Sequence, residues 1–428
     1  MEVRFYESVA DEQLKFAVIV AKAQGKWVFC KHKERDTYEV PGGHREPGET
    51  IWECACRELY EETGAVSYHM EPICVYSVAD GPAGSGETFG MLYYGEIVSF
   101  EEELHSEIEK IILTDEPVEK WTYPAIQPLL MEKVQQCVKK LEFVSMEFIA
   151  RGWSADKKYK AVTADGNKYL LRITPPEKSG NRPEMFRLQK KISELGVPMC
   201  KPVEFGSCAE GVYTIQTWIE GVDAEELIPC LREREQYDYG YEAGRILKRI
   251  HRIPAPEGQP DWELRFNRKM DRKIRMYEEC PVKFEGAEHM IAYIEANRHL
   301  LKDRPQSFQH GDYHIGNMMM ENGRLVIIDF DRYDYGDPWE EFNRIVWCAQ
   351  KAPVFATGMV EGYFEDNVPE EFWRLLALYI SSNMLSSIPW AIPFGEEEIK
   401  TMLNQARDVL SWYDNMENPV PRWYLGKG

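Results

Sequence analysis

Three glutamates, Glu58, Glu61 and Glu62, form the first group of residues that could do chemistry, because they lie in a segment with helical periodicity. A helix advances about 100° per residue, so the three carboxylates share one face. Carboxylates on one face repel each other unless a cation neutralises them, and hard oxygen ligands select Mg²⁺ or Mn²⁺. The spacing therefore predicts a divalent metal site, with a plain exposed acidic helix as the alternative.

Glycines flank this predicted helix of about residues 50–63. Gly42 and Gly43 precede it, and without Cβ atoms they let the backbone approach a metal ion or a phosphate. Gly64 is expected to end the helix in the left-handed conformation. Arg57 is expected to orient one of the carboxylates by bidentate hydrogen bonding, with Glu49 completing the salt-bridge network.

The whole pattern resembles the Nudix box; it reads Gly43-x5-Glu49-x7-Arg57-Glu58-Leu59-Tyr60-Glu61-Glu62-Thr63-Gly64-Ala65. The resemblance implies a Nudix α/β/α sandwich that hydrolyses a nucleoside diphosphate linked to another moiety, using metal-activated water. It implies Glu58, Glu61 and Glu62 as metal ligands, with the backbone of Gly43 beside them. Glu58 and Glu61 are the catalytic candidates, and a carboxylate outside the box is the other candidate base. The run TYEVPGGHREPGE looks most like members that clean nucleotide pools, so an oxidised or ordinary nucleoside triphosphate is the expected substrate.

A second group of reactive residues comprises Asp312 in a loop, Asn317 five residues later, and Asp329 at the end of an apolar run. These are the parts needed for kinase-type phosphoryl transfer. Asp312 would accept the proton of a substrate hydroxyl, while Asn317 and Asp329 would hold Mg²⁺ on the nucleotide phosphates. Taken alone, the His310-Gly311-Asp312 run also fits a turn capped by His310, with Asp312 binding backbone amides.

The segments HGDYHIGN (310–317) and LVIIDFD (325–331) resemble the aminoglycoside phosphotransferase and choline kinase group, over about residues 143–428. The resemblance implies a bilobal protein-kinase-like fold and ATP or GTP as the phosphoryl donor. The implied acceptor is a hydroxyl on a small molecule such as an aminoglycoside, a sugar or an amino alcohol. Aromatic residues near Asp334, Glu340 or Glu341 are candidates for lining the acceptor pocket, although most aromatics in these helices are expected in the core.

The predicted small lobe departs from the family pattern, because KYLLRIT offers Arg172 where a lysine is usual. We expect Arg172 to clamp nucleotide phosphates and to pair with Glu184, although a planar guanidinium is not equivalent to an ammonium. The alternative is an edge-strand arginine that only pairs with Glu184 or faces water. Ser154, in the loop after Gly152, is expected to cover the phosphates; a simple hairpin turn is the alternative.

The departure at Arg172 also motivates a rival interpretation, in which a nucleotide-binding pseudokinase domain regulates the Nudix half. The intact set of Asp312, Asn317 and Asp329 argues against it, because degenerate kinases usually lose one of these residues.

The elements that must position these residues suggest a two-domain α+β protein, with a Nudix domain at 1–141 and a kinase-like domain at 142–428. The first has two strands in 16–30, a Gly-rich loop, strands at 72–78 and 89–98, and a helix at about 125–141. The second has a small lobe (about 142–220), with hairpins around 164–167 and within 203–219 and a helix at 184–195. Its large lobe (about 221–428) is mostly helical, with a loop at 309–317 and a strand pair near 318–330.

The net charge and the distribution of apolar residues limit which binding partners we expect. The net charge is −21, and residues 1–142 carry 27 acidic against 14 basic side chains, so binding to nucleic-acid polymers is not expected. In the C-terminal half the negative charge would also suit a cationic substrate, with a solvated acidic surface as the alternative. The N-terminus lacks the apolar core of a secretion signal, and no run approaches about 18 apolar residues. We therefore expect a cytoplasmic protein that does not span a membrane.

Overall fold

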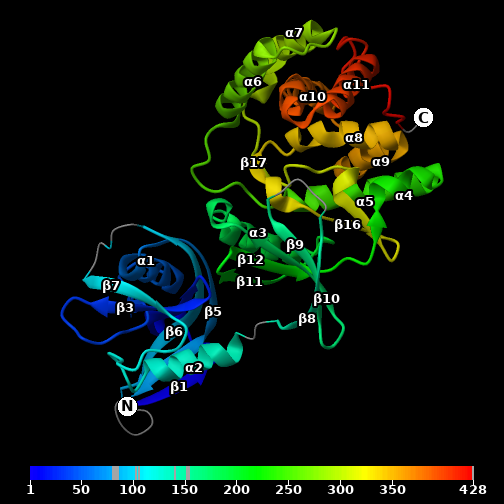
Figure 1. Ribbon diagram of the computed structural model, residues 1–428. Coiled ribbons are helices and arrows are strands. Elements are labelled where there is room, and N and C mark those ends of the chain that lie inside the picture. Colours follow the sequence, from blue (N-terminus) through cyan, green and yellow to red (C-terminus); the bar gives the residue numbers. More distant parts are fainter. Residues whose placement is uncertain (80–85, 102–103, 105–106, 139–140, 151–154, 427–428) are drawn as a thin grey trace. The chain divides into compact units, whose positions relative to one another are not determined.

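The computed structural model describes residues 1–428 except 80–85, 102–103, 105–106, 139–140, 151–154 and 427–428 (Figure 1). The chain divides into two compact units. The first contains Met1–Lys191 and Lys201–Trp218, and the second contains Ile192–Cys200 and Ile219–Gly428. The domain boundary expected after residue 141 lies within the first unit and stays a prediction.

A seven-stranded sheet with one helix on each face forms the N-terminal part of the first unit. Its order is β1-β5-β6-β2-β3-β7, and β4 pairs with β2. The helix α1 packs on one face with Ala17, Ile19 and Ala21, whereas α2 packs on the other with Val20. Alternate β2 residues thus serve opposite faces, and the predicted α/β/α sandwich is confirmed. The bounds are β1 Glu2–Tyr6, β2 Leu14–Ala23, β3 Lys26–His32, β4 Gly42–His44, β5 Ala65–Ala79, β6 Thr88–Phe100, β7 Ile108–Thr114, α1 Ile51–Thr63 and α2 Gln127–Cys137.

The ends of α1 follow from local sequence. The Thr50 hydroxyl accepts a hydrogen bond from the Glu53 N–H at 3.1 Å, and the Glu53 carboxylate accepts one from the Thr50 N–H at 2.7 Å. This reciprocal pair is a capping box. Gly64 ends the helix at φ +71°, so the predicted left-handed cap is confirmed. The helix that carries the three box glutamates is therefore fixed at both ends.

A five-stranded antiparallel sheet, ordered β11-β12-β10-β9-β8, completes the first unit and confirms both predicted hairpins. The two sheets share buried contacts within this unit: the Glu96 carboxylate accepts hydrogen bonds from the Ser207 N–H at 3.0 Å and its hydroxyl at 2.7 Å. These contacts explain why the first unit extends beyond the Nudix segment. The bounds are β8 Phe143–Phe148, β9 Lys157–Thr163, β10 Lys168–Thr174, β11 Pro202–Cys208 and β12 Gly211–Thr217, with the helix α3 at Arg182–Glu194.

The second unit is mostly helical, as expected, and its core forms where α10 packs against α6 and α7 (Figure 1). Two small sheets, β13-β15-β16 and β14-β17, position the loop at 310–317. The helices are α4 Ala224–Leu227, α5 Glu233–Ile250, α6 Trp262–Glu279, α7 Ala287–Asn297, α8 Ile345–Lys351, α9 Pro353–Phe364, α10 Glu370–Ala391 and α11 Glu396–Trp412. The strands are β13 Val222–Asp223, β14 Ser307–Gln309, β15 Met318–Glu321, β16 Arg324–Ile327 and β17 Asp334–Gly336.

One helical stretch, Glu370–Phe394, is long and apolar enough by composition to cross a membrane. Its most apolar window is 72% buried inside the protein. Most of these side chains are buried against neighbouring helices such as α6, α7 and α11, as in the core helix of a globular unit.

Candidate functional site

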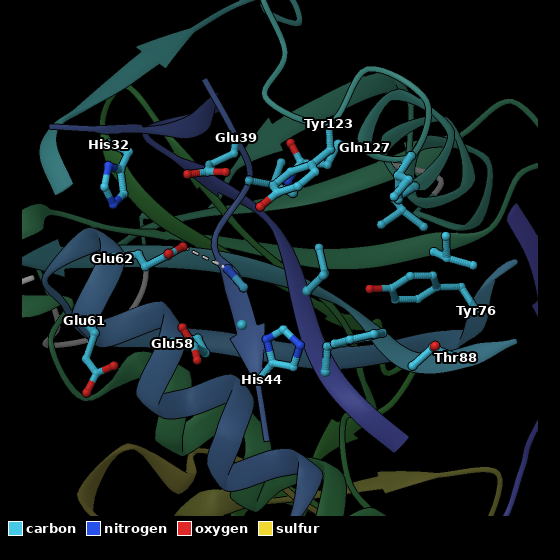
Figure 2. A pocket seen from close by; sticks show the side chains of 18 of the residues that line it. His32, Glu39, His44, Glu58, Glu61, Glu62, Tyr76, Thr88, Tyr123 and Gln127 are labelled. Carbon is cyan, nitrogen blue, oxygen red and sulfur yellow. Dashed lines mark hydrogen bonds between the residues drawn. The ribbon is translucent and has the colours of Figure 1, made fainter. Parts of the chain in front are cut away.

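A cavity of about 580 Å³ opens beside α1 in the first unit. Figure 2 shows Glu58, Glu61 and Glu62 at one end of it, with Tyr76 and Thr88 toward the other. Ligand sites usually measure about 300–1,000 Å³ and combine apolar walls with a few polar groups. The cavity therefore has the size of a small-molecule site, with an acidic end and an aromatic end.

Arg57 holds the acidic end in place. Its guanidinium bonds both oxygens of Glu49, at 2.7 and 3.1 Å, so the bidentate pair forms with Glu49 and not with one of the three clustered glutamates as expected. Its Nη1 atom also lies 2.8 Å from Glu58 Oε1 and 3.1 Å from Glu61 Oε2. One guanidinium thus sets the positions of three carboxylates, which fits the role expected for Arg57 and Glu49.

Gly43 lies directly against the cluster. A Cβ atom built on Gly43 would stand 2.2 Å from Glu58 Oε1, and one on Gly42 would stand 2.6 Å from the Ala17 carbonyl oxygen. Neither position accepts a side chain without displacement of its neighbour. The Gly42 N–H also donates to Glu62 Oε2 at 2.9 Å (Figure 2).

Two carboxylates at the acidic end of the cavity, Glu58 and Glu62, have raised pKa values. Burial, with the nearby charges of Glu58 and Glu39, raises the pKa of Glu62 to about 8 against the lowering effect of the Gly42 N–H. Burial also raises the pKa of Glu58, although Arg57 opposes the shift. Buried carboxylates behave in this way when negative charge is under-compensated. A bound cation would restore the balance.

Among the described residues, no three His, Cys, Asp or Glu side chains already stand close enough together to hold a metal ion. The donor chemistry nevertheless fits a hard divalent cation, because Glu58, Glu61, Glu62 and the Gly43 backbone line the same acidic end. Arg57 bonds two of these carboxylates as they stand. The expected metal ligands are therefore neighbours, and their roles stay predictions.

Several residues that line the cavity were not singled out from the sequence. Glu39 is buried, its pKa is raised mainly by burial, and it faces the cavity from outside the box (Figure 2). Tyr123, in the loop before α2, and Gln127, the first residue of α2, also line the cavity. Only Glu39 carried a local signal, as a carboxylate just before the Pro-Gly-Gly turn.

A second constellation lies in the loop after β14 in the second unit. The Asn317 side-chain amide donates to the Asp312 carbonyl at 2.9 Å, and the Ile328 N–H donates to the Asn317 carbonyl at 3.0 Å. The next residue, Asp329, is exposed and has a left-handed backbone at φ +64°. Backbone and side-chain bonds thus bring the expected Asp312, Asn317 and Asp329 into one neighbourhood.

Glu341 fixes the start of this loop. Its buried carboxylate accepts hydrogen bonds from the N–H groups of His310, at 2.5 Å, and Gly311, at 2.8 Å. Gly311 has φ +84°, and a Cβ there would lie 1.8 Å from the Arg332 carbonyl oxygen. The loop conformation therefore requires glycine at this position.

Two arginines and one histidine lie near the Asp312 carboxylate. Arg344 Nε lies 3.3 Å from Oδ1, and Arg332 Nε lies 4.0 Å from Oδ2. His314 Nε2 lies 3.6 Å from Oδ1, but burial lowers the pKa of His314 to about 4, so its ring is neutral at pH 7. Its Nδ1 accepts from the Gly316 N–H at 3.1 Å. These contacts agree with a structural role for His314 rather than that of a base.

Residues 145–375 match the Phosphotransferase enzyme family, which covers more than half of the chain. The chain belongs to the phosphotransferase enzyme family. Residues 11–133 of this phosphotransferase match the NUDIX domain, so both resemblances noted in the sequence are confirmed.

Individual relatives match smaller parts. Over 78 residues the phosphotransferase is 37% identical to YtkD of Bacillus subtilis (strain 168), named as an 8-oxo-dGTP diphosphatase. That match covers 18% of this chain and 49% of YtkD, so the chain spans about half the length of this curated relative.

Solved structures show lower similarity. The Bacillus subtilis pyrophosphohydrolase BsRppH is 23% identical, with a TM-score of 0.28, over 31% of this chain and 90% of its own. Aminoglycoside phosphotransferase APH(4)-Ia is 16% identical, with a TM-score of 0.47, over 68% of this chain and 99% of its own. Amicoumacin kinase hAmiN is 14% identical, with a TM-score of 0.48, over 69% of this chain and 95% of its own.

The nucleotide-binding residues expected in the phosphotransferase lie in the first unit. Arg172 is on β10, and its Nε atom lies 3.7 Å from Asp156 Oδ2, which also accepts from Arg182 at 2.8 Å. The structure thus records an ion pair of Arg172 with Asp156, a residue not considered from the sequence. Glu184 lies exposed in the first turn of α3. Ser154 lies outside the described residues, and the roles of all three stay predictions.

Proposed function

We propose that the NUDIX part hydrolyses a diphosphate bond of a nucleoside triphosphate, oxidised or ordinary, with Mg²⁺ or Mn²⁺. The observation that carries the proposal is that one cavity has the box glutamates at one end and aromatic and apolar side chains at the other (Figure 2). Phosphates would lie at the acidic end through the metal, and the base at the end with Tyr76 and Tyr123. The similarity to YtkD, named for 8-oxo-dGTP, supports this substrate class.

In this proposal Glu58, Glu61, Glu62 and the Gly43 carbonyl would hold the metal, which would supply a water of lowered pKa. Arg57 keeps the carboxylates oriented toward it. Glu58, Glu61, or Glu39 as the cavity carboxylate outside the box would accept the proton of the water that attacks phosphorus, and pyrophosphate would leave. Of these groups, Glu39 and Glu58 are buried, whereas the Glu61 side chain is 46% exposed.

Pyrophosphate release from 8-oxo-dGTP and dGTP by the full chain tests this proposal. Glu61→Gln or Glu62→Gln should abolish hydrolysis because each removes a charged metal ligand. Glu132→Gln, on the exposed side of α2, is the matched control and should keep wild-type rates. Phosphotransfer by the same variants should persist. Equal loss of both activities in a folded variant would contradict two independent sites.

For the second site we infer ATP- or GTP-dependent phosphorylation of a hydroxyl on a small molecule. The observation that carries this inference is the hydrogen bond from Asn317 to Asp312, together with the bond from the Ile328 N–H to Asn317 that brings the next residue, Asp329, near both. Asp312 would accept the hydroxyl proton, while Asn317 and Asp329 would hold the Mg²⁺ that accompanies the nucleotide. Nucleotide turnover across aminoglycoside, sugar and amino-alcohol acceptors tests it.

The engagement of Arg172 by Asp156 favours one rival, a pseudokinase that binds nucleotide and regulates the NUDIX part. The rival predicts nucleotide binding without acceptor phosphorylation, together with a change in hydrolysis when ATP is present. A mass-spectrometric search of small-molecule pools for species that gain a phosphoryl group distinguishes the two. We also propose that the enzyme works in the cytoplasm, where its ten free cysteines would stay reduced.

A further inference from the structure

We propose that the phosphoryl acceptor carries an anionic group, a phosphate or a carboxylate, bound by Lys269, Lys273 and Arg344 beside Asp312. The inference rests on the proposed phosphotransferase activity and narrows its acceptor class. We call these three residues the cationic cluster. All of its members lie in the second unit.

Arg344 connects the cluster to the reacting end of the site. It is the last residue of the short helical segment Glu340–Arg344, and its Nε atom lies 3.3 Å from Asp312 Oδ1. Its side chain is 25% exposed, so it is covered on most sides yet open to a ligand. A hydroxyl that approaches Asp312 would therefore come close to a guanidinium, which binds carboxylates and phosphates through two parallel hydrogen bonds.

Lys269 and Lys273 extend the positive surface along α6. They are four residues apart, so they share a helix face. Lys269 Nζ lies 3.2 Å from Glu340 Oε1, at the other end of the segment that carries Arg344. The charges of Lys269, Arg344 and Glu340 all act on Lys273. Lys269 and Lys273 on α6, and Arg344 in the segment Glu340–Arg344, thus all act on the buried carboxylate of Glu340.

The charge of Lys273 is only partly neutralised by the nearby carboxylate of Glu340. Burial, followed by the repulsion of Lys269, lowers its pKa to about 7, and Glu340 only partly opposes this. Such a depressed pKa is typical of an ammonium that has lost water without gaining a full partner. An anionic ligand would supply that partner, whereas a cationic ligand would add to the repulsion.

Three acidic residues near the site already have partners, which leaves them less available to a cationic acceptor. Asp334 pairs with Arg265 at 3.4 Å, and Glu340 pairs with Lys269. Glu341 is buried and accepts the loop N–H groups. The acidic composition suggested a cationic substrate as one alternative, but the local charge around Asp312 favours the opposite sign.

Two measurements on the full chain test the inference. In the first, inorganic phosphate is titrated calorimetrically without divalent metal into wild type, Lys273→Met, Lys273→Arg and Lys400→Met. Lys400 is exposed on α11 and serves as the matched control. We expect Lys273→Met to weaken phosphate binding about tenfold, the value of one charge-assisted contact, and the other two variants to bind like wild type.

In the second measurement, ATP turnover is compared across acceptors that share one ring: glucose, glucosamine, glucuronate and glucose 6-phosphate, with kanamycin added. The inference predicts higher kcat/KM for glucuronate or glucose 6-phosphate than for the neutral and cationic acceptors. The better of the two distinguishes a carboxylate from a phosphate. Lys273→Met should raise the acceptor KM and leave the ATP KM unchanged.

The outcomes separate this inference from the proposed function. Preference for glucosamine, glucose or kanamycin, or unchanged phosphate binding in Lys273→Met, overturns the anionic acceptor alone. If Lys273→Met instead raises the KM for ATP and leaves the acceptor KM unchanged, the cationic cluster binds the donor nucleotide. That result also overturns the anionic acceptor. Absence of turnover with every acceptor counts against the phosphotransferase activity, and the phosphate titration then still decides whether the cluster binds anions.

Discussion

Replacement of Lys273 by methionine should stabilise the second unit at neutral pH. Methionine keeps a long unbranched side chain and removes the ammonium, whose pKa falls from 10.5 to about 7 in the folded protein. Glu340 keeps its partner Lys269 at 3.2 Å, so the substitution leaves no isolated carboxylate. The variant therefore removes an unfavourable charge without removing a needed pair.

The sign and size follow from proton linkage. Below pH 7 the lysine is charged in both states, and the full cost opposes folding. Between pH 7 and 10.5 the folded chain has released the proton that the unfolded chain still holds, so the cost falls as pH rises. At about 1.4 kcal/mol per pKa unit the upper bound is about 5 kcal/mol. Because Lys273 keeps part of its surface exposed, we expect a gain on the order of 1–2 kcal/mol.

Urea unfolding followed by tryptophan fluorescence at pH 6, 7.5, 9 and 10 measures this gain. The midpoint difference between Lys273→Met and wild type should be largest at pH 6 and small at pH 10. Lys400→Met should show no difference at any pH, because its side chain is exposed. A variant that is less stable at pH 6, or a gain that does not change with pH, would refute the reasoning about Lys273.

Three further predictions concern the two sites. Gly43→Ala should reduce diphosphate hydrolysis on the order of 10²-fold, because the added Cβ would stand 2.2 Å from Glu58 Oε1 and displace that carboxylate; steady-state pyrophosphate release measures this, and a rate within twofold of wild type would show that Glu58 moves without cost. Asp312→Asn should reduce phosphoryl transfer by about 10²–10⁴, the usual contribution of a positioned base. Single-turnover kinetics measure the transfer step, nucleotide titration should show unchanged binding, and unchanged turnover would make the base assignment wrong. Arg172→Ala should weaken productive nucleotide engagement more than it harms folding, and Arg172→Lys shows whether a point charge suffices; changes within about twofold in titration and single turnover would remove Arg172 as the phosphate clamp.

The parts that were predictable from sequence are those that depend on short-range spacing. The box glutamates and Arg57 lie within one helix, and the capping residues of that helix are its neighbours in the chain. Periodicity and local capping rules therefore suffice to place them. The same holds for Asp312 and Asn317, because a five-residue loop leaves few arrangements for their hydrogen bond.

Long-range contacts could not be derived in this way. The cavity brings together three residues that are far apart in the sequence: Glu39, Tyr123 and Gln127. Their proximity depends on the order of the seven strands in the sheet. The partner of Arg172 is another example, since Asp156 lies just before β9 and the approach of β9 to β10 brings the two together. The type of residue indicated a carboxylate partner for Arg172, but only the strand pairing decides which one it meets.

The contrast between global and local charge gives the clearest reason why composition misleads at the second site. A net charge of −21 suggests an environment suited to cationic ligands. Yet charges separated by more than about 8–10 Å are largely screened in salt, so a ligand responds chiefly to the groups that touch it. Around Asp312 those groups are Arg344 and Arg332, with the lysines of α6 next to Arg344. The carboxylates that dominate the total are here bound to arginine, lysine or backbone N–H groups. The proposed sign of the acceptor therefore depends on Lys273, because Glu340 only partly offsets the effects of burial and of Lys269 on this ammonium.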